Sequence, residues 1–352
     1  MEKKEKIIIG LCLIATIFAG VLHYTNANQV FAFAVTAVAL ALLALIVGDA
    51  TEQLGSRFGP SATGILQSGL GNLPELFVSI FALRAGLANV VQAALVGSIL
   101  GNSLLVFGLA LFFGGLKNGK QTFKSETPKM IATLMILAVS ALIIPTLARE
   151  LHTPAAAHID KLDIFCALIL LVLLAASVYF SIKGDKAVSP EPTHEENHQQ
   201  WSMGLTIAVL AGAGIGAAFV SEWFVSALEP AMKALGLSEA FAGLVVVAIA
   251  GNAIENLIGI QLAWRNQSDY AVSVILNSSL QVALGLFPVL VLLSFVLGGS
   301  ILTFALSPLL VVALALSTVV TAFVVYDGES IWLEGLALIG LYCIIAASFW
   351  WG

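Results

Sequence analysis

The chain has 352 residues, of which 59% are hydrophobic and only 10% are charged, against roughly 25% charged residues in an ordinary soluble domain. This composition indicates an integral membrane protein, and the formal net charge of -6 gives no indication of nucleic acid binding. The apolar runs have the length of membrane-spanning helices, which excludes the short alternating strands of an outer-membrane barrel.

The apolar runs and the polar residues between them predict an all-α polytopic membrane protein with about eleven transmembrane helices. The expected helices cover approximately residues 7–25, 29–54, 60–83, 87–115, 129–147, 162–182, 202–228, 239–264, 270–297, 301–325 and 330–350. The first run follows basic residues, as a secretory signal does, but no small-residue cleavage site follows it. We therefore expect residues 1–28 to form a first transmembrane helix in the mature protein.

The lysines and arginines predict the orientation, because basic residues favour the cytoplasmic side of the membrane. With the N-terminus inside, four of the fifteen lysines and arginines lie outside and the other eleven lie in the cytoplasm. The four outside are Arg84, Arg149, Lys161 and Lys233. The sequence therefore predicts a cytoplasmic N-terminus and an external C-terminus.

The chain contains an internal repeat. The segment GNLPEL at 71–76 resembles GNAIEN at 251–256, and SILGNSLLV at 98–106 resembles VILNSSLQV at 274–282. The repeat predicts two five-helix halves, residues 29–182 and 202–352, joined by a polar cytoplasmic linker at 183–201. Because five is odd, the halves enter the membrane from opposite sides, and such inverted repeats are typical of secondary transporters.

Each copy of the motif carries one glutamate in an apolar run. Glu75 is the only charged residue between Pro60 and Leu83, and Glu255 is the only one between Phe241 and Trp264. A carboxylate within the membrane is costly and is usually functional. Neither run contains a lysine or arginine, so the partner of each glutamate is a bound cation, a proton or water in a cavity.

Two carboxylates brought together by a pseudo-twofold axis suit a hard divalent cation such as Ca²⁺, which binds six to eight oxygen ligands. Asn72 and Asn252 lie three residues before Glu75 and Glu255, on the same helix face, and can add amide oxygens. Pro74 and the neighbouring glycines are expected to unwind the helix locally and free the Leu70 carbonyl. Without a cation, two desolvated carboxylates would hold protons, so calcium and protons would compete for the same oxygens.

Other polar residues are candidates for an ion path or for structural roles. Glu52 and Glu222, near the predicted ends of two helices, either relay ions or are simply solvated, and Asp49 has the same ambiguity. The polar residues of the helices at 87–115 and 270–297 either line a cation path or join helices through hydrogen bonds. They are Asn102, Ser103, Asn277, Ser278, Ser279 and Gln281.

The cysteines and the polar residues of the linker do not predict catalytic or covalent chemistry. The three cysteines, Cys12, Cys166 and Cys343, lie far apart in apolar runs and predict no disulfide framework. Acidic and histidine residues of the linker either bind a regulatory cation or are solvated. We expect no cofactor. The expected substrates are Ca²⁺ and H⁺, the expected surroundings are the lipid bilayer, and a homo-oligomer is left open.

The duplicated segments resemble the cation/proton exchangers of the calcium/cation antiporter superfamily. The resemblance rests on GDATEQLGSRFGPSATGILQSGLGNLPELFVSIFALRAG, SEWFVSALEPAMKALGLSEAFAGLVVVAIAGNAIEN and NSSLQVALGLFPVLVL. It implies eleven helices, an extra first helix before two inverted five-helix repeats, and exchange of cytosolic calcium for protons at Glu75 and Glu255. It further implies a bacterial plasma-membrane protein. Leu73-Pro74 departs from the alanine-threonine pair common in the first motif.

Three alternatives remain. A sodium/calcium exchanger would have the same fold with a different driving ion. A cation channel could line its pore with Glu75 and Glu255, although inverted repeats favour alternating access. An intramembrane enzyme is disfavoured, because the sequence shows no serine-histidine or paired-aspartate arrangement.

Overall fold

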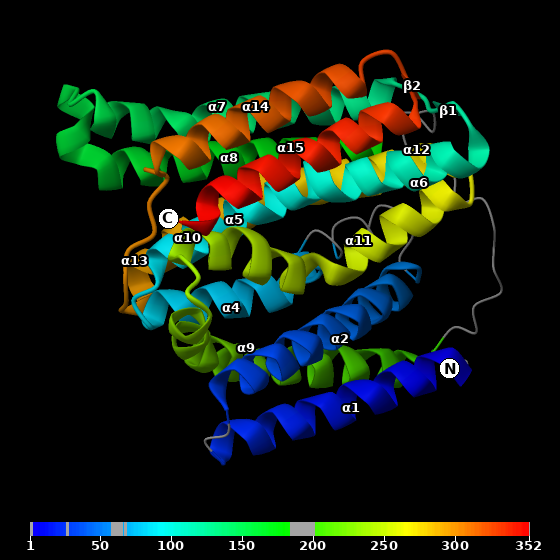
Figure 1. The fold of residues 1–352 in the computed structure, drawn as a ribbon, viewed down its shortest axis with the longest axis vertical. Helices are drawn as coiled ribbons and strands as arrows, with labels where there is room; N and C mark the ends of the chain where they lie inside the picture. Colours follow the sequence, from blue (N-terminus) through cyan, green and yellow to red (C-terminus); the bar gives the residue numbers. More distant parts are fainter. Residues whose placement is uncertain (1–2, 26–27, 58–65, 67–68, 184–200, 352) are drawn as a thin grey trace. The chain divides into compact units, whose positions relative to one another are not determined.

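The structure, a computed structural model, describes residues 3–25, 28–57, 66, 69–183 and 201–351, without the side chains of residues 3–4, 181–183 and 253–256. Most of the predicted linker, residues 184–200, lies outside the described residues. The described chain is almost entirely helical and forms two compact units (Figure 1). The first unit comprises residues 1–85, 178–237 and 250–254, and the second comprises 86–177, 238–249 and 255–352.

Within the described residues, four helices lie entirely in the first unit. They are α1 (Lys3–Tyr24), α2 (Gln29–Gly55), α4 (Leu73–Arg84) and α9 (Met203–Leu235). Figure 1 shows α2 beside both α1 and α9. Phe33 stacks on Phe224 with ring centroids 4.8 Å apart, and Leu43 lies against Gly216, so α2 and α9 pack antiparallel.

Trp201 joins three segments of the first unit. Its side chain is buried, and its indole N–H donates to Oε2 of Glu5 at 3.0 Å. Its backbone N–H donates to Oε1 of Gln53 at 3.2 Å, and its carbonyl accepts a hydrogen bond from Arg57. The start of α9 is thus held against the beginning of α1 and the end of α2.

The second unit contains the remaining helices and two short strands. They are α5 (Ala88–Leu100), η1 (Gly101–Val106), α6 (Phe107–Asn118), β1 (Gln121–Thr122), α7 (Glu126–Glu150), η2 (Pro154–His158), α8 (Ile159–Lys183), α10 (Glu239–Phe241), η3 (Ala242–Val247), α11 (Ala248–Trp264), α12 (Ser268–Gln281), η4 (Val282–Leu286), α13 (Phe287–Leu297), α14 (Pro308–Val324), β2 (Glu329–Ser330) and α15 (Trp332–Trp350). The strands pair antiparallel, with Gln121 opposite Ser330. Residues 250–254 of α11 and 178–183 of α8 group with the first unit.

Glycines let the helices of the second unit approach closely. A Cβ on Gly97 of α5 would lie 2.2 Å from the carbonyl oxygen of Leu244 in η3. A Cβ on Gly243 would lie 2.4 Å from the carbonyl oxygen of Val90. Gly108 of α6 and Gly335 of α15 make a second crossing of this kind, and Figure 1 shows α6 and α15 side by side.

Within the described residues, eight helical spans are long and apolar enough to cross a membrane, or nine if 239–252 and 257–264 form one bent span. Each of the eleven predicted runs contains helix, but in three of them the helix does not cover the predicted range as one continuous segment with the predicted ends. The run at 60–83 breaks at Gly71 and Asn72, and 58–65 and 67–68 lie outside the described residues. The helix expected at 301–325 begins only at Pro308, and the helix expected to end at 228 continues to Leu235 despite Pro230.

Candidate functional site

We call the two copies of the repeated motif, residues 71–76 and 251–256, the GN motifs. The first GN motif lies where the chain enters α4. Gly71 and Asn72 form a turn, Asn72 is the residue that precedes the helix, and Pro74 lies in its first turn, where a missing N–H costs no helical hydrogen bond. The backbone N–H of Leu76 donates to the carbonyl of Asn72 at 2.9 Å. The predicted local interruption is therefore confirmed. Glu75 lies in the first turn of α4, where the helix dipole favours negative charge.

Glu75 contacts the second GN motif within the first unit. A Cβ built on Gly251 would lie 2.7 Å from Cγ of Glu75 and 3.1 Å from its Oε1. Only a glycine therefore leaves room for this side chain, and Oε1 of Glu75 is buried there. The repeat equivalence found in the sequence thus corresponds to physical contact between one carboxylate and the other copy of its motif.

The amide side chains of both motifs are buried in the first unit. Asn72 is 7% exposed and Asn252 is 4% exposed. Buried amide oxygens next to a carboxylate are the ligands that Ca²⁺ prefers. Glu255 follows in α11, within the second unit, and its side chain lies outside the described residues.

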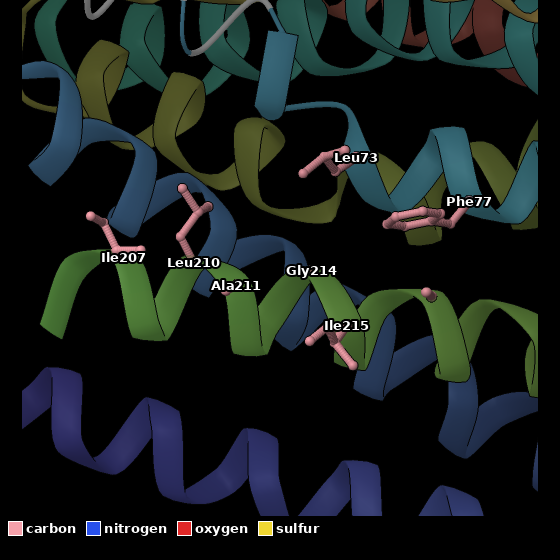
Figure 2. Close-up of a pocket in the computed structure, with 8 residues that line it drawn as sticks. Leu73, Phe77, Ile207, Leu210, Ala211, Gly214 and Ile215 are labelled. Atoms are coloured by element: carbon pink, nitrogen blue, oxygen red, sulfur yellow. The ribbon is translucent and has the colours of Figure 1, made fainter. Parts of the chain in front are cut away.

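An apolar groove runs beside α4 but does not contain Glu75. Leu73 and Phe77 line it from α4, and Ile207, Leu210 and Ile215 are among its lining residues on α9 (Figure 2). Its volume is about 470 Å³. Because Leu73 and Phe77 are two residues before and after Glu75, the glutamate points away from the groove. The groove lacks the oxygen ligands that a hydrated cation would need.

Glu52 and Glu222 occupy exposed positions. Glu222 lies within α9 rather than at a helix end, because α9 is longer than expected. The residue before each glutamate is different: Thr51 and Ser221 are fully buried, and neither hydroxyl has a hydrogen-bond partner among the described residues. Asp49 is half-buried. The repeat thus places one buried hydroxyl beside one exposed carboxylate in each copy.

The polar residues of the helices at 88–118 and 268–297 include an interhelical network in the second unit. Asn102 donates to Oγ of Ser278 at 2.9 Å, and Oγ of Ser279 donates to the carbonyl of Ile99 at 3.4 Å. Ser103 donates to the carbonyl of Ile99 at 2.6 Å. These bonds support the helix-joining interpretation for Asn102 and Ser279, which are both buried.

Asn277 and Gln281 are less enclosed than this network. Asn277 is exposed on α12, and Gln281 is half-buried immediately before η4. Sequence reasoning missed that η1, η3 and η4 are π-helical, because apolar periodicity does not distinguish a π-helix from an α-helix. Such segments are rare and often occur at functional sites. Asn102 and Ser103 lie within η1.

Among the described residues, no group of three or more histidine, cysteine, aspartate or glutamate side chains could hold a metal ion. The carboxylate of Glu75 and the buried amide of Asn72, three residues before it, offer a cation oxygen ligands. That ligand set suits a transported hard cation better than a permanently bound zinc or copper ion.

Long apolar helices, a broken helix and a buried carboxylate in its first turn define a multi-pass membrane protein of the transporter class. The family model for sodium/calcium exchanger protein matches residues 28–183 and 205–351. The chain belongs to this family.

Curated relatives match over nearly the whole chain. A Ca²⁺/H⁺ antiporter of Synechocystis is 33% identical over 371 residues, which cover 99% of this chain and 98% of the relative. The Ca²⁺/H⁺ antiporter ChaA of Bacillus subtilis is 35% identical, with 95% of each chain covered. These relatives are transporters rather than enzymes.

Solved structures match the fold. The structure of native YfkE has a TM-score of 0.83 and 32% identity, and the match covers 97% of this chain and 99% of that one. The structure of the H⁺/Ca²⁺ exchanger CAX has a TM-score of 0.74 at 17% identity, with 99% of this chain and 92% of that one covered. The second likeness concerns the fold alone.

Proposed function

We propose that this protein is a secondary active transporter that exchanges cytosolic Ca²⁺ for external H⁺, and that it is not an enzyme. The contact between Glu75 and Gly251 is the observation that carries the proposal, because it joins a membrane carboxylate to the second copy of its motif. The relatives named Ca²⁺/H⁺ antiporters, with about one third of their residues identical, support the same choice of ions.

In this proposal Glu75 and Glu255 bind Ca²⁺ alternately with protons, and Asn72 and Asn252 contribute amide oxygens. Two carboxylates that release two protons for each Ca²⁺ keep the charge of the site unchanged. A site that crosses the membrane barrier only when it is loaded with one or the other couples the two fluxes. Alternating access, rather than a pore, follows from the requirement that calcium and protons compete.

The proposed architecture is an extra first helix followed by two inverted five-helix repeats, residues 29–182 and 202–352, with the linker 183–201 in the cytoplasm. The antiparallel pairing of α2 and α9 supports it. An offset of 170 relates Thr36 to Thr206 and Thr51 to Ser221, and all four are buried. Helices related by a twofold axis in the membrane plane pair in this manner.

The orientation is part of the same proposal. The N-terminus lies in the cytoplasm, the C-terminus lies outside, and the membrane is the bacterial plasma membrane. The proposed ion route and its supporting network consist of Glu52, Glu222, Asn102, Ser103, Asn277, Ser279 and Gln281. Asn277 and Gln281, the more accessible of the amides, are its first candidates for transient contact with ions.

The test is calcium flux into proteoliposomes that contain the purified protein, under an imposed pH gradient and without sodium. We expect calcium uptake that dissipates the pH gradient. In a second assay, a sodium gradient replaces the pH gradient. Calcium uptake that appears only there, and that is indifferent to pH, would instead establish sodium/calcium exchange by the same fold. Calcium flux down its own gradient without proton movement would indicate a channel.

A further inference from the structure

Asp163 is a buried carboxylate that lies outside the GN motifs. It is on α8, one turn after the start of the helix, and its exposed fraction is 0%. Cys166, Ala167 and Leu170 follow it on the same buried face of the helix. Neither oxygen of Asp163 makes a regular hydrogen bond with the described residues, and the backbone N–H of Phe304 lies next to its carboxylate.

The neighbour of Asp163 is the irregular segment 298–307, which connects α13 to α14 in the second unit. Leu302 and residues 304–306 of this segment are buried although the segment has no helical hydrogen bonds, so their backbone groups need other partners. Phe304 is fully buried and packs on Phe287, with ring centroids 5.0 Å apart. The backbone N–H of Leu302 donates to Oγ of Ser294 at 3.0 Å.

Three side chains donate hydrogen bonds to backbone carbonyls of the segment. Gln92 donates to the carbonyl of Thr303 at 2.8 Å, and Thr146 donates to that of Phe304 at 3.1 Å. The two terminal nitrogens of Arg149 donate to the carbonyls of Ala305 and Leu306, each at 2.9 Å. These four carbonyls already accept hydrogen bonds, which would compete with their binding to a metal cation beside Asp163.

Few charged or titratable groups face Asp163. Arg149 approaches it from α7, and Asp160 and Cys166 flank it on α8. The segment 298–307 contains no charged residue, and the contact of α8 with η4, through Leu174 and Gly285, is apolar. Arg149 directs its terminal donors to Ala305 and Leu306 and its Nε to Glu150 at 3.3 Å. The positive charge of Arg149 is thus shared among several acceptors, and the negative charge of Asp160 opposes its effect on Asp163.

We infer that Asp163 is a proton-binding site, occupied by a proton while segment 298–307 covers it. A neutral carboxylic acid fits this enclosed place, because an ionised carboxylate that has the Phe304 N–H next to it but makes no regular hydrogen bond among the described residues would be costly. The bound proton keeps the segment seated between α7 and α8. When the proton leaves, the resulting carboxylate recruits water and the segment loosens, so the packing of 298–307 depends on pH.

This proton site is separate from the paired glutamates, and its tests do not require transport. Infrared spectroscopy of the reconstituted full-length protein detects the carbonyl stretch of protonated carboxylic acids. Near neutral pH, we expect Asp163→Asn to lack one such band that the unsubstituted protein has. Asp160→Asn, which removes an exposed acid one turn earlier, should retain that band. Identical spectra for the unsubstituted protein and Asp163→Asn would show that Asp163 is ionised and would overturn the inference.

Amide hydrogen exchange tests the link to the segment. Protection of residues 298–307 is compared between the unsubstituted protein and Asp163→Asn at each pH from about 6 to about 9, since the asparagine cannot ionise and the chemical effect of pH on exchange cancels. We expect protection in the unsubstituted protein to fall relative to the variant as the pH rises. Equal protection at every pH would contradict the proposed role of the proton.

Discussion

At the scale of single residues, the closest contact at the candidate site is between Glu75 and Gly251. Gly251→Ala would place a methyl carbon 2.7 Å from Cγ of Glu75, and the carboxylate would have to move. We expect calcium uptake to fall at least several-fold, since a binding geometry that is shifted by about 1 Å can cost about 100-fold in a rate. Calcium flux into proteoliposomes measures the effect.

The control for that substitution is Gly69→Ala, because a Cβ at Gly69 would meet no atom of the described residues within 4 Å. Both variants add one methyl group close to a GN motif, but only one crowds the carboxylate. Comparable flux from the two variants would mean that the space at Gly251 does not serve Glu75.

The sequence indicated Glu75, Asn72 and the break at Pro74, because charge and proline are conspicuous in an apolar run. It could not indicate Asp163 as a buried group. Asp163 lies close to the start of a run, next to Lys161 and Asp160, where a charged residue is usually solvated. Its burial depends on segment 298–307, which is more than a hundred residues away in the chain and was expected to be mostly helix.

At the scale of elements, the crossing of α5 and η3 depends on two glycines. Gly97→Ala would place a methyl carbon 2.2 Å from the Leu244 carbonyl oxygen, and neither backbone can yield easily. We expect a loss of about 1–3 kcal/mol or more in stability, as overpacking typically causes. Thermal unfolding in detergent measures it.

Gly340→Ala on α15 serves as the matched control, because no atom lies within 4 Å of its added methyl group. Alanine favours helix over glycine by about 1 kcal/mol, so this variant should be as stable as the unsubstituted protein or more so. If Gly97→Ala unfolds at the same temperature as Gly340→Ala, the close crossing is not required for stability.

Helix positions were largely predictable from hydropathy, whereas their interruptions, apart from the one that precedes Pro74, were not. Segment 298–307 contains apolar residues that suit a helix, yet it is held in an irregular conformation by Gln92, Thr146 and Arg149. These partners come from α5 and α7, and tertiary hydrogen bonds of this kind leave no local signal in the sequence. The three π-helical segments in the described residues were missed because apolar periodicity does not distinguish a π-helix from an α-helix.

At the scale of the whole molecule, the orientation predicts which loops face each side of the membrane. In a variant without its three native cysteines, a cysteine at Lys120 should react only with reagents on the cytoplasmic side, and one at Ala155 only with reagents outside. Both positions are exposed. Labelling of both from the same side would contradict the prediction that α7, the helix between them, crosses the membrane, and reversed labelling would invert the direction of transport.

Calcium binding should also stabilise the whole fold, because a ligand that binds only the folded state adds about 2.7 kcal/mol at one hundred times its dissociation constant. We expect calcium to raise the unfolding temperature of the unsubstituted protein. Glu75→Gln should lose that increase while it unfolds near the same temperature in the absence of calcium. An undiminished increase in this variant would place the binding site elsewhere.

The central claim is that calcium and protons compete for Glu75 and Glu255, and proton release on calcium binding tests it most directly. Calcium is added to the purified protein in weakly buffered solution, and a pH indicator reports the protons that are released for each Ca²⁺ bound. We predict release from the unsubstituted protein and its loss in both Glu75→Gln and Glu255→Gln. Calcium binding without proton release, or release that persists in both variants, would contradict the claim.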